Sequence, residues 1–148
     1  MKAESQRLRE KVALGEFGGP KIVISAQASE SNDSLGRVKE VLQQIIDCSS
    51  NDHWPSDEEW TARLPQWFTS TFEGRTIEAV LADENLWDYG SWLDAMRHRG
   101  WEWWNSSFDE AQHKWAATLV RAEDVYSIEP LVYLARQSGA SAVEVTEE

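Results

Sequence analysis

Residues 99–107, RGWEWWNSS, constrain the fold most, because three of these nine residues are tryptophan. Six of the nine tryptophans of the chain lie between positions 87 and 115. Each indole buries on the order of 200 Å² when packed, so several of them must form a core. In a strand, Trp101 and Trp103 point to one face, and Trp104 shares the other with Glu102 and Ser106. We therefore expect Trp101 and Trp103 to be buried and Trp104 to be half exposed.

Hydrophobic spacing along the rest of the chain predicts both strands and helices. Period-two or short β-branched runs predict strands over 21–26, 101–106, 113–121 and 141–145. Helical spacing predicts helices over 35–46, from Ser56 onward, over 89–99 and after Ser127. Residues 76–82 fit a short helix capped by Thr76 or, alternatively, a strand.

These elements predict an α+β fold, with a small, mostly antiparallel sheet of about four strands and amphipathic helices packed on it. We expect residues 1–148 to form a single domain, a size that can bury a real core. Within it, residues 1–19 are predicted as a helical arm and residues 47–56 as an internal linker.

The charge of the chain is unevenly distributed. The net charge is −12, and residues 47–148 hold twenty acidic and seven basic residues. An acidic field of this size repels nucleic acid and anionic lipid and attracts basic proteins. No apolar run approaches the roughly 20 residues that span a bilayer, and the charged N-terminus lacks a signal-peptide core. We therefore expect a cytoplasmic protein that contacts neither a membrane nor nucleic acid directly.

The sequence contains no complete catalytic or cofactor motif. His53, His98 and His113 lack the spacing of a zinc site. The single cysteine, Cys48, follows Asp47, which disfavours the thiolate that a nucleophile needs. Carboxylate pairs are too numerous to single out a general acid. We expect no metal, no cofactor and no catalytic residue, so that an enzyme is the less favoured reading.

Acidic residues and a tryptophan are expected to meet at one end of the fold. If the helix over 91–99 runs one way and the strand over 101–106 returns, the loops over 83–90 and 107–112 share an end of the layer. The predicted partner-binding residues are Asp83, Glu84, Trp87, Asp88, Asp109 and Glu110, together with Trp104. Aromatic side chains among charges are typical of protein-binding hot spots.

Two stretches also carry a resemblance. WPSDEEWTARLPQWF (54–68) and LWDYGSWLDAMRHRGWEWWNSS (86–107), followed by LVYLARQSGA (131–140), resemble segments of small, tryptophan-rich bacterial proteins to which no activity is assigned. In size, acidity and α+β character the chain also resembles immunity proteins of bacterial toxin systems. That resemblance implies a protein that blocks a basic nuclease or another toxin.

Three hypotheses about function follow. The leading one is a non-enzymatic acidic binding protein that neutralises a basic protein partner, an immunity protein against a bacterial toxin being the main example. The first alternative is an acidic inhibitor that mimics nucleic acid against a nucleic-acid-binding machine. The second is a small hydrolase or ligand-binding domain with a pocket near Trp104. The partner's identity and the oligomeric state stay open.

Overall fold

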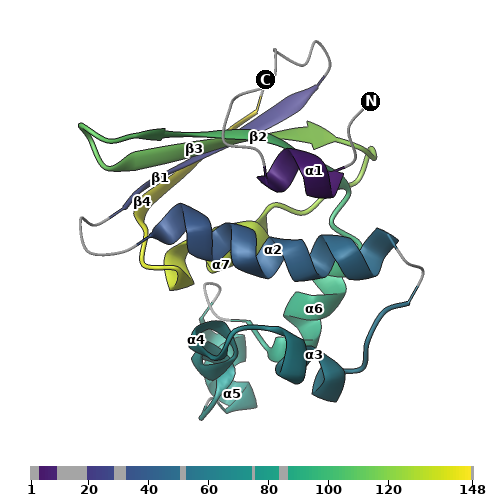
Figure 1. The fold of residues 1–148 in the computed structure, drawn as a ribbon. Coiled ribbons are helices and arrows are strands. Elements are labelled where there is room, and N and C mark those ends of the chain that lie inside the picture. Colours follow the sequence, from purple (N-terminus) through teal and green to yellow (C-terminus); the bar gives the residue numbers. More distant parts are fainter. Residues whose placement is uncertain are drawn as a thin grey trace.

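Four antiparallel strands form one sheet, and helices pack beneath it (Figure 1). The computed structural model describes residues 4–9, 20–28, 33–50, 53–74, 76–83 and 87–147. The strand order is β2-β3-β1-β4, so β2 and β4 are the two edges. The strands are β1 (Lys21–Gln27), β2 (Trp101–Asp109), β3 (Lys114–Arg121) and β4 (Ser141–Glu147). The expected α+β class and four-stranded antiparallel sheet are confirmed.

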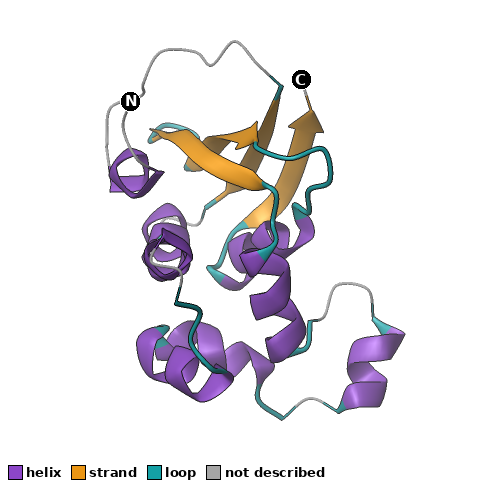
Figure 2. Ribbon diagram, turned by 90° about the vertical axis from the view of Figure 1, so that its right-hand side faces the viewer, coloured by secondary structure: helices purple, strands orange, loops and turns teal. Residues whose placement is uncertain are grey.

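Two of the helices lie directly beneath the sheet, a short N-terminal helix packs at one edge of it, and the others lie farther away (Figures 1 and 2). The helices of the described residues are α1 (Glu4–Arg9), α2 (Ser34–Ser50), α3 (Asp57–Arg63), α4 (Gln66–Thr69), the 3₁₀ turn η1 (Ser70–Phe72), α5 (Ile77–Ala82), α6 (Tyr89–Arg97) and α7 (Glu129–Gln137). Helices α2 and α7 form the layer next to the sheet, and α6 packs against both of them.

Capping side chains explain where several helices begin. The Ser56 hydroxyl accepts a hydrogen bond from the Glu59 N–H and donates one to the Glu59 carboxylate, the predicted capping box. The Thr76 hydroxyl accepts from the Ala79 N–H, which settles residues 76–82 as a helix rather than a strand. Gly100 adopts a φ of 77° after α6, and a β-carbon there would collide with the Val125 carbonyl oxygen. Only glycine fits that turn.

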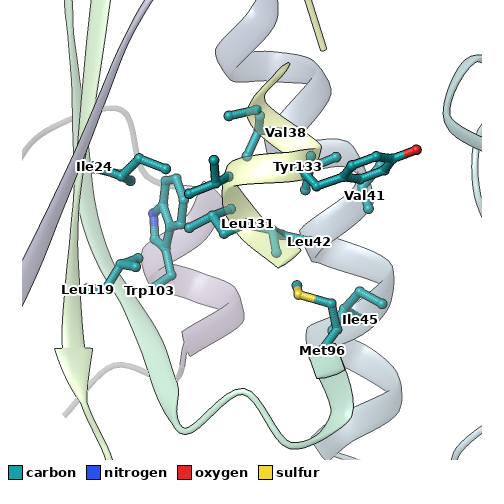
Figure 3. Packing of buried hydrophobic residues seen from close by; sticks show 14 of the residues in the cluster. Ile24, Val38, Val41, Leu42, Ile45, Met96, Trp103, Leu119, Leu131 and Tyr133 are labelled. Atoms are coloured by element: carbon teal, nitrogen blue, oxygen red, sulfur yellow. The ribbon is translucent and has the colours of Figure 1, made fainter. Parts of the chain in front are cut away.

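The core lies between the sheet and the layer of α2 and α7. In Figure 3, Trp103 lies beside Ile24 and Leu119 of the sheet and faces Leu131 of α7. The four tryptophans predicted to be core are at most 1% exposed: Trp92, Trp101, Trp103 and Trp115. Trp60, which stands among acidic residues in the sequence, is fully buried as well. Large aromatic rings thus form a substantial part of this small core.

A β-bulge changes which side of β2 faces the core. The pairing of β2 with β3 shifts register between Trp103 and Asn105. One extra residue in a strand reverses the alternation of side chains that follow it. As a result Ser106 is buried at 9% exposure, not on the outer face that the sequence alternation predicts, whereas Trp104 is half-buried as expected.

Helix α1 covers the edge of the sheet at β2. The Glu4 carboxylate accepts the Trp103 N–H at 2.7 Å, and Arg7 Nε donates to the Trp103 carbonyl at 3.0 Å. The other Glu4 oxygen lies 2.8 Å from the Arg99 guanidinium, and Arg99 Nε donates to the Trp101 carbonyl. Side chains therefore occupy positions that a further strand would otherwise take.

The N-terminal segment and the predicted linker differ from the expectation in detail. Of residues 1–19, the structure describes 4–9, and this helix packs against β2 instead of projecting as an arm. Helix α2 continues to Ser50, so residues 47–50 are helical and not linker. The sequence CSS after Asp47 contains no glycine or proline that would end the helix. Among the described helices, none has the length and apolar composition to cross a bilayer.

Candidate functional site

The predicted partner-binding residues occupy two separate places. Asp83 ends α5, and the Asp88 carboxylate caps α6 by accepting the Ser91 N–H at 3.0 Å. Asp109 ends β2 and its carboxylate accepts the N–H groups of the following turn, at Ala111 and Gln112. Glu110 is exposed in that turn, Trp87 is half-buried against the core, and Glu84 lies outside the described residues.

The structure does not bring these two acidic groups together. In Figures 1 and 2 the β2–β3 turn belongs to the sheet layer, whereas the end of α5 and the start of α6 lie on the far side of the helices. The single acidic end expected from the sequence is therefore not formed. The reason is that α6 does not run alongside β2 in the opposite direction. It packs beneath α2 and α7, away from the sheet.

A different carboxylate joins the group at the start of α6. A β-carbon placed on Gly90 would lie 3.4 Å from Asp57 Oδ2 and 3.6 Å from Asp88 Oδ2, so these two carboxylates flank the same glycine. The Tyr89 hydroxyl, bonded to Thr61 of α3, holds the two helices together at this point. Burial raises the pKa of Tyr89, and the Asp57 charge adds to that rise. The sequence marks Asp57 only as one of many acids, because no short-range pattern pairs it with Asp88.

Helix α5 presents an exposed apolar side chain between two acids that are close to it in sequence. Leu81 is 82% exposed, and Glu78 and Asp83 on the same short helix are exposed too. Figure 2 shows α5 set apart from the other helices. A leucine within an acidic rim is an arrangement found where proteins bind one another.

Trp104, on β2, packs against an arginine of α1. The Arg7 guanidinium carbon lies 5.0 Å from the centre of the Trp104 ring, a cation–π arrangement. The same guanidinium contacts the exposed Glu102 carboxylate at 3.3 Å. Trp104 therefore helps to hold α1 in place. It lines neither the hollow beside Cys48 nor the hollow beside Arg121.

A small hollow beside Cys48 is lined mainly by side chains that contain nitrogen. It holds about 230 Å³ and is lined by Cys48, Ser49, His53, Trp54, Arg97 and His98. His53 faces Glu59 at 3.7 Å and His98 faces Asp94 at 3.6 Å, so each imidazole already has a carboxylate close by. Burial raises the pKa of the Cys48 thiol, which keeps it protonated and poorly nucleophilic. Within the described residues, no three His, Cys, Asp or Glu side chains are grouped so that they could hold a metal ion.

The described residues offer two kinds of surface on which a partner or a ligand could bind. One is the exposed leucine of α5 with its neighbouring acids, and the other is the small hollow lined by one guanidinium and two imidazoles. Comparison with known proteins adds no further assignment: no protein-family model, no curated protein and no solved structure matches the chain.

Proposed function

We propose that this chain is a non-enzymatic acidic binding protein that acts in the cytoplasm by neutralising a basic protein partner, most specifically as an immunity protein against a bacterial toxin. The observation that carries the proposal is Leu81, 82% exposed on α5 between Glu78 and Asp83. A single exposed leucine is ordinary on a protein surface. One that stands within a carboxylate rim, on a chain of net charge −12, supports a contact with a positively charged surface.

The two kinds of side chain would act on different rates. Exposed carboxylates attract a basic partner over a distance of about 10 Å at moderate salt and so raise the association rate. Leu81, once covered, would lose its contact with water and slow dissociation. Trp87 would contribute less directly than its sequence context suggests, because its ring already packs against the protein's own core.

The test begins with capture of the partner from the native cell and continues with binding kinetics. Reversing Glu78 and Asp83 to lysine should slow association and weaken its salt dependence. The matched control reverses Glu123 and Asp124, two exposed acids in the β3–α7 loop, which changes the net charge equally. Equal slowing by both pairs would contradict a localised contact and leave only a general effect of charge.

Leu81→Ala should raise the dissociation rate with little change in association. Alanine keeps the helix propensity of α5, so the change tests contact with the partner and not the integrity of the helix. A captured partner that binds nucleic acid and is displaced by it would favour the nucleic-acid-mimicking inhibitor over the immunity protein.

A second candidate function rests on the hollow beside Cys48. Arg97, His53 and His98 line it together, in a chain that is otherwise strongly acidic. This set favours a small anion with a carboxylate or phosphate group, a ligand-binding role of the kind that the sequence suggested for Trp104. Titration with inorganic phosphate, followed through the imidazole NMR signals, would detect it; unchanged His53 and His98 signals would exclude this candidate.

A further inference from the structure

The two edge strands of the sheet differ in what bonds to their outward-facing backbone. At β2 the outward-facing backbone is bonded to side chains of Glu4, Arg7 and Arg99. Strand β4 is the opposite edge, and among the described residues its backbone pairs only with β1. Most of its side chains are exposed, and Val145 is 38% exposed. Proteins usually protect such an edge, because it is a template for another strand.

The pairing pattern identifies the backbone groups on that open edge. Residues of an antiparallel pair alternate between bonding to one neighbour and to the other. Ala28 donates its N–H to the His113 carbonyl and Pro20 accepts from Arg121, so the even-numbered residues of β1 bond to β3. The odd-numbered ones, Val23 and Ser25, must bond to β4, at Thr146 and Glu144.

It follows that the N–H and C=O groups of Val145 and Glu147, which lie in the regular part of the β1–β4 pairing, point away from the sheet. The same alternation applied to β2 makes Trp101 and Trp103 the outward-pointing residues. These are the two residues whose backbone the side chains of α1 and Arg99 contact. The agreement at the covered edge supports the assignment at the open one.

The side chains of β4 define which strand would fit. Glu144 and Thr146 pair with Ser25 and Val23 and share the outer face of the sheet with them. Val145 pairs with the buried Ile24 and lies on the face toward the helices, as does Val143 two residues earlier. An added strand would therefore meet a carboxylate on one face and valines on the other.

We propose that the open edge of β4 binds an extended segment of a partner protein by strand addition, a segment in which lysine or arginine alternates with apolar residues. Backbone hydrogen bonds to Val145 and Glu147 would supply the register, and Glu144 would select the positive charge. This inference rests on the proposed function only for the sign of the partner's charge. A second copy of the chain fits less well, because each copy has a net charge of −12 and its own β4 contains no basic residue to pair with Glu144.

The first experiment uses the unmodified protein and two short synthetic peptides of equal charge. One alternates lysine with valine, and the other alternates lysine with proline, which cannot donate backbone hydrogen bonds. Only the lysine–valine peptide should slow hydrogen exchange at the Val145 and Glu147 amides. If both peptides act alike, or if neither changes these amides, strand addition is refuted. If these amides are protected without peptide and the protein sediments as a dimer, the edge belongs to a second copy and the proposal is overturned.

The second experiment changes the edge without disturbing the β1 ladder. Proline at position 145 removes an N–H that points outward, so the bonds of Glu144 and Thr146 to β1 are kept. Val145→Pro should weaken the lysine–valine peptide about tenfold or more, the value of one or two backbone hydrogen bonds. Val145→Ala is the matched control, because it shortens the same side chain and keeps the N–H, and it should change affinity by less than about threefold. Equal affinity of the proline and alanine variants would contradict the proposal.

Protection of the Glu144 and Thr146 amides in Val145→Pro verifies that the ladder persists, and Glu144→Lys gives an independent variant with an intact backbone. This reversal should weaken binding of the lysine–valine peptide at low salt; unchanged affinity would remove the role given to Glu144.

The peptide measurements need no cellular partner. If the peptide pairs with β4 but no basic protein is captured from the cell, the proposed function is overturned and strand addition stands. If a basic partner is captured and its binding is insensitive to Val145→Pro, strand addition is overturned and the proposed function stands.

Discussion

Replacing Glu4 by alanine tests whether α1 stabilises the sheet through its charged side chains. Glu4 and Arg99 are 11% and 8% exposed and lie 2.8 Å apart, so the pair is mostly withdrawn from water. The second Glu4 oxygen accepts the Trp103 N–H. The alanine variant would leave a guanidinium without its carboxylate and a backbone donor without its acceptor. Breaking a buried pair in this way costs about 3–5 kcal/mol of unfolding free energy.

The lower end of that range is the expected value. Burial raises the pKa of Glu4 even though Arg99 and the Trp103 N–H lower it, so desolvation already offsets much of the attraction. Arg99 would also keep its bonds to the Trp101 and Met96 carbonyls. We therefore expect a loss of about 3 kcal/mol, measured by urea unfolding with an unchanged m-value.

The control is Glu102→Ala, which removes an acid that pairs with the buried Arg7 of α1 but is itself 51% exposed. Because this carboxylate is in contact with water and Arg7 keeps its bond to the Trp103 carbonyl, the loss should be about 1 kcal/mol or less. Hydrogen exchange supplies a second measurement: the Trp103 amide should exchange faster in Glu4→Ala and not in Glu102→Ala. If the two variants lose the same stability, the buried contacts of Glu4 do not hold α1 on the β2 edge, and the reasoning fails.

Three further predictions concern the core, pH and the thiol. Trp103→Ala should cost about 3–5 kcal/mol of unfolding free energy in urea, and Trp104→Ala distinctly less, because only the first ring is fully buried. The folded-state pKa of Glu4 is raised above 4.5, so the folded protein binds this proton more tightly than the unfolded chain does. The stability of the native protein relative to Glu4→Gln should therefore be greatest below about pH 4.5 and fall as pH rises through the raised pKa, which unfolding curves at several pH values would check. Burial also raises the pKa of Cys48, so at pH 7 iodoacetamide should alkylate it more slowly than a small free thiol, and urea should abolish the difference.

Local patterns in the sequence were enough to predict most elements of the fold. The stripe of α2, the capping box at Ser56 and the short β-branched run of β1 each depend on residues close in sequence. Hydrophobic spacing and side-chain caps act over one or two turns, so they can be read without knowing the tertiary structure. The same holds for the tryptophans of the core, since large rings at regular spacing have to be buried.

The arrangement of the predicted site could not be derived in this way. Whether Asp88 meets Asp57 or Asp109 depends on how α6 packs against α2 and α7, and no pattern near Asp88 encodes that packing. The bulge after Trp103 moved Ser106 to the buried face, although strict alternation placed it outside. The contact between Glu4 and Arg99 joins residues 95 positions apart, and no local sequence pattern around either residue predicts it.

The strand order also has a consequence for synthesis of the chain. Strand β1 lies in the middle of the sheet, between β3 and β4, yet it leaves the ribosome long before either partner. At 5–20 residues per second, the roughly 100 residues between Ile22 and its first partner, Leu119 of β3, take on the order of ten seconds to make. During that time the apolar run IVISA has no strand with which to pair. A nascent chain stalled before β3 should therefore bind chaperones through β1, and release should follow synthesis of residues 114–147.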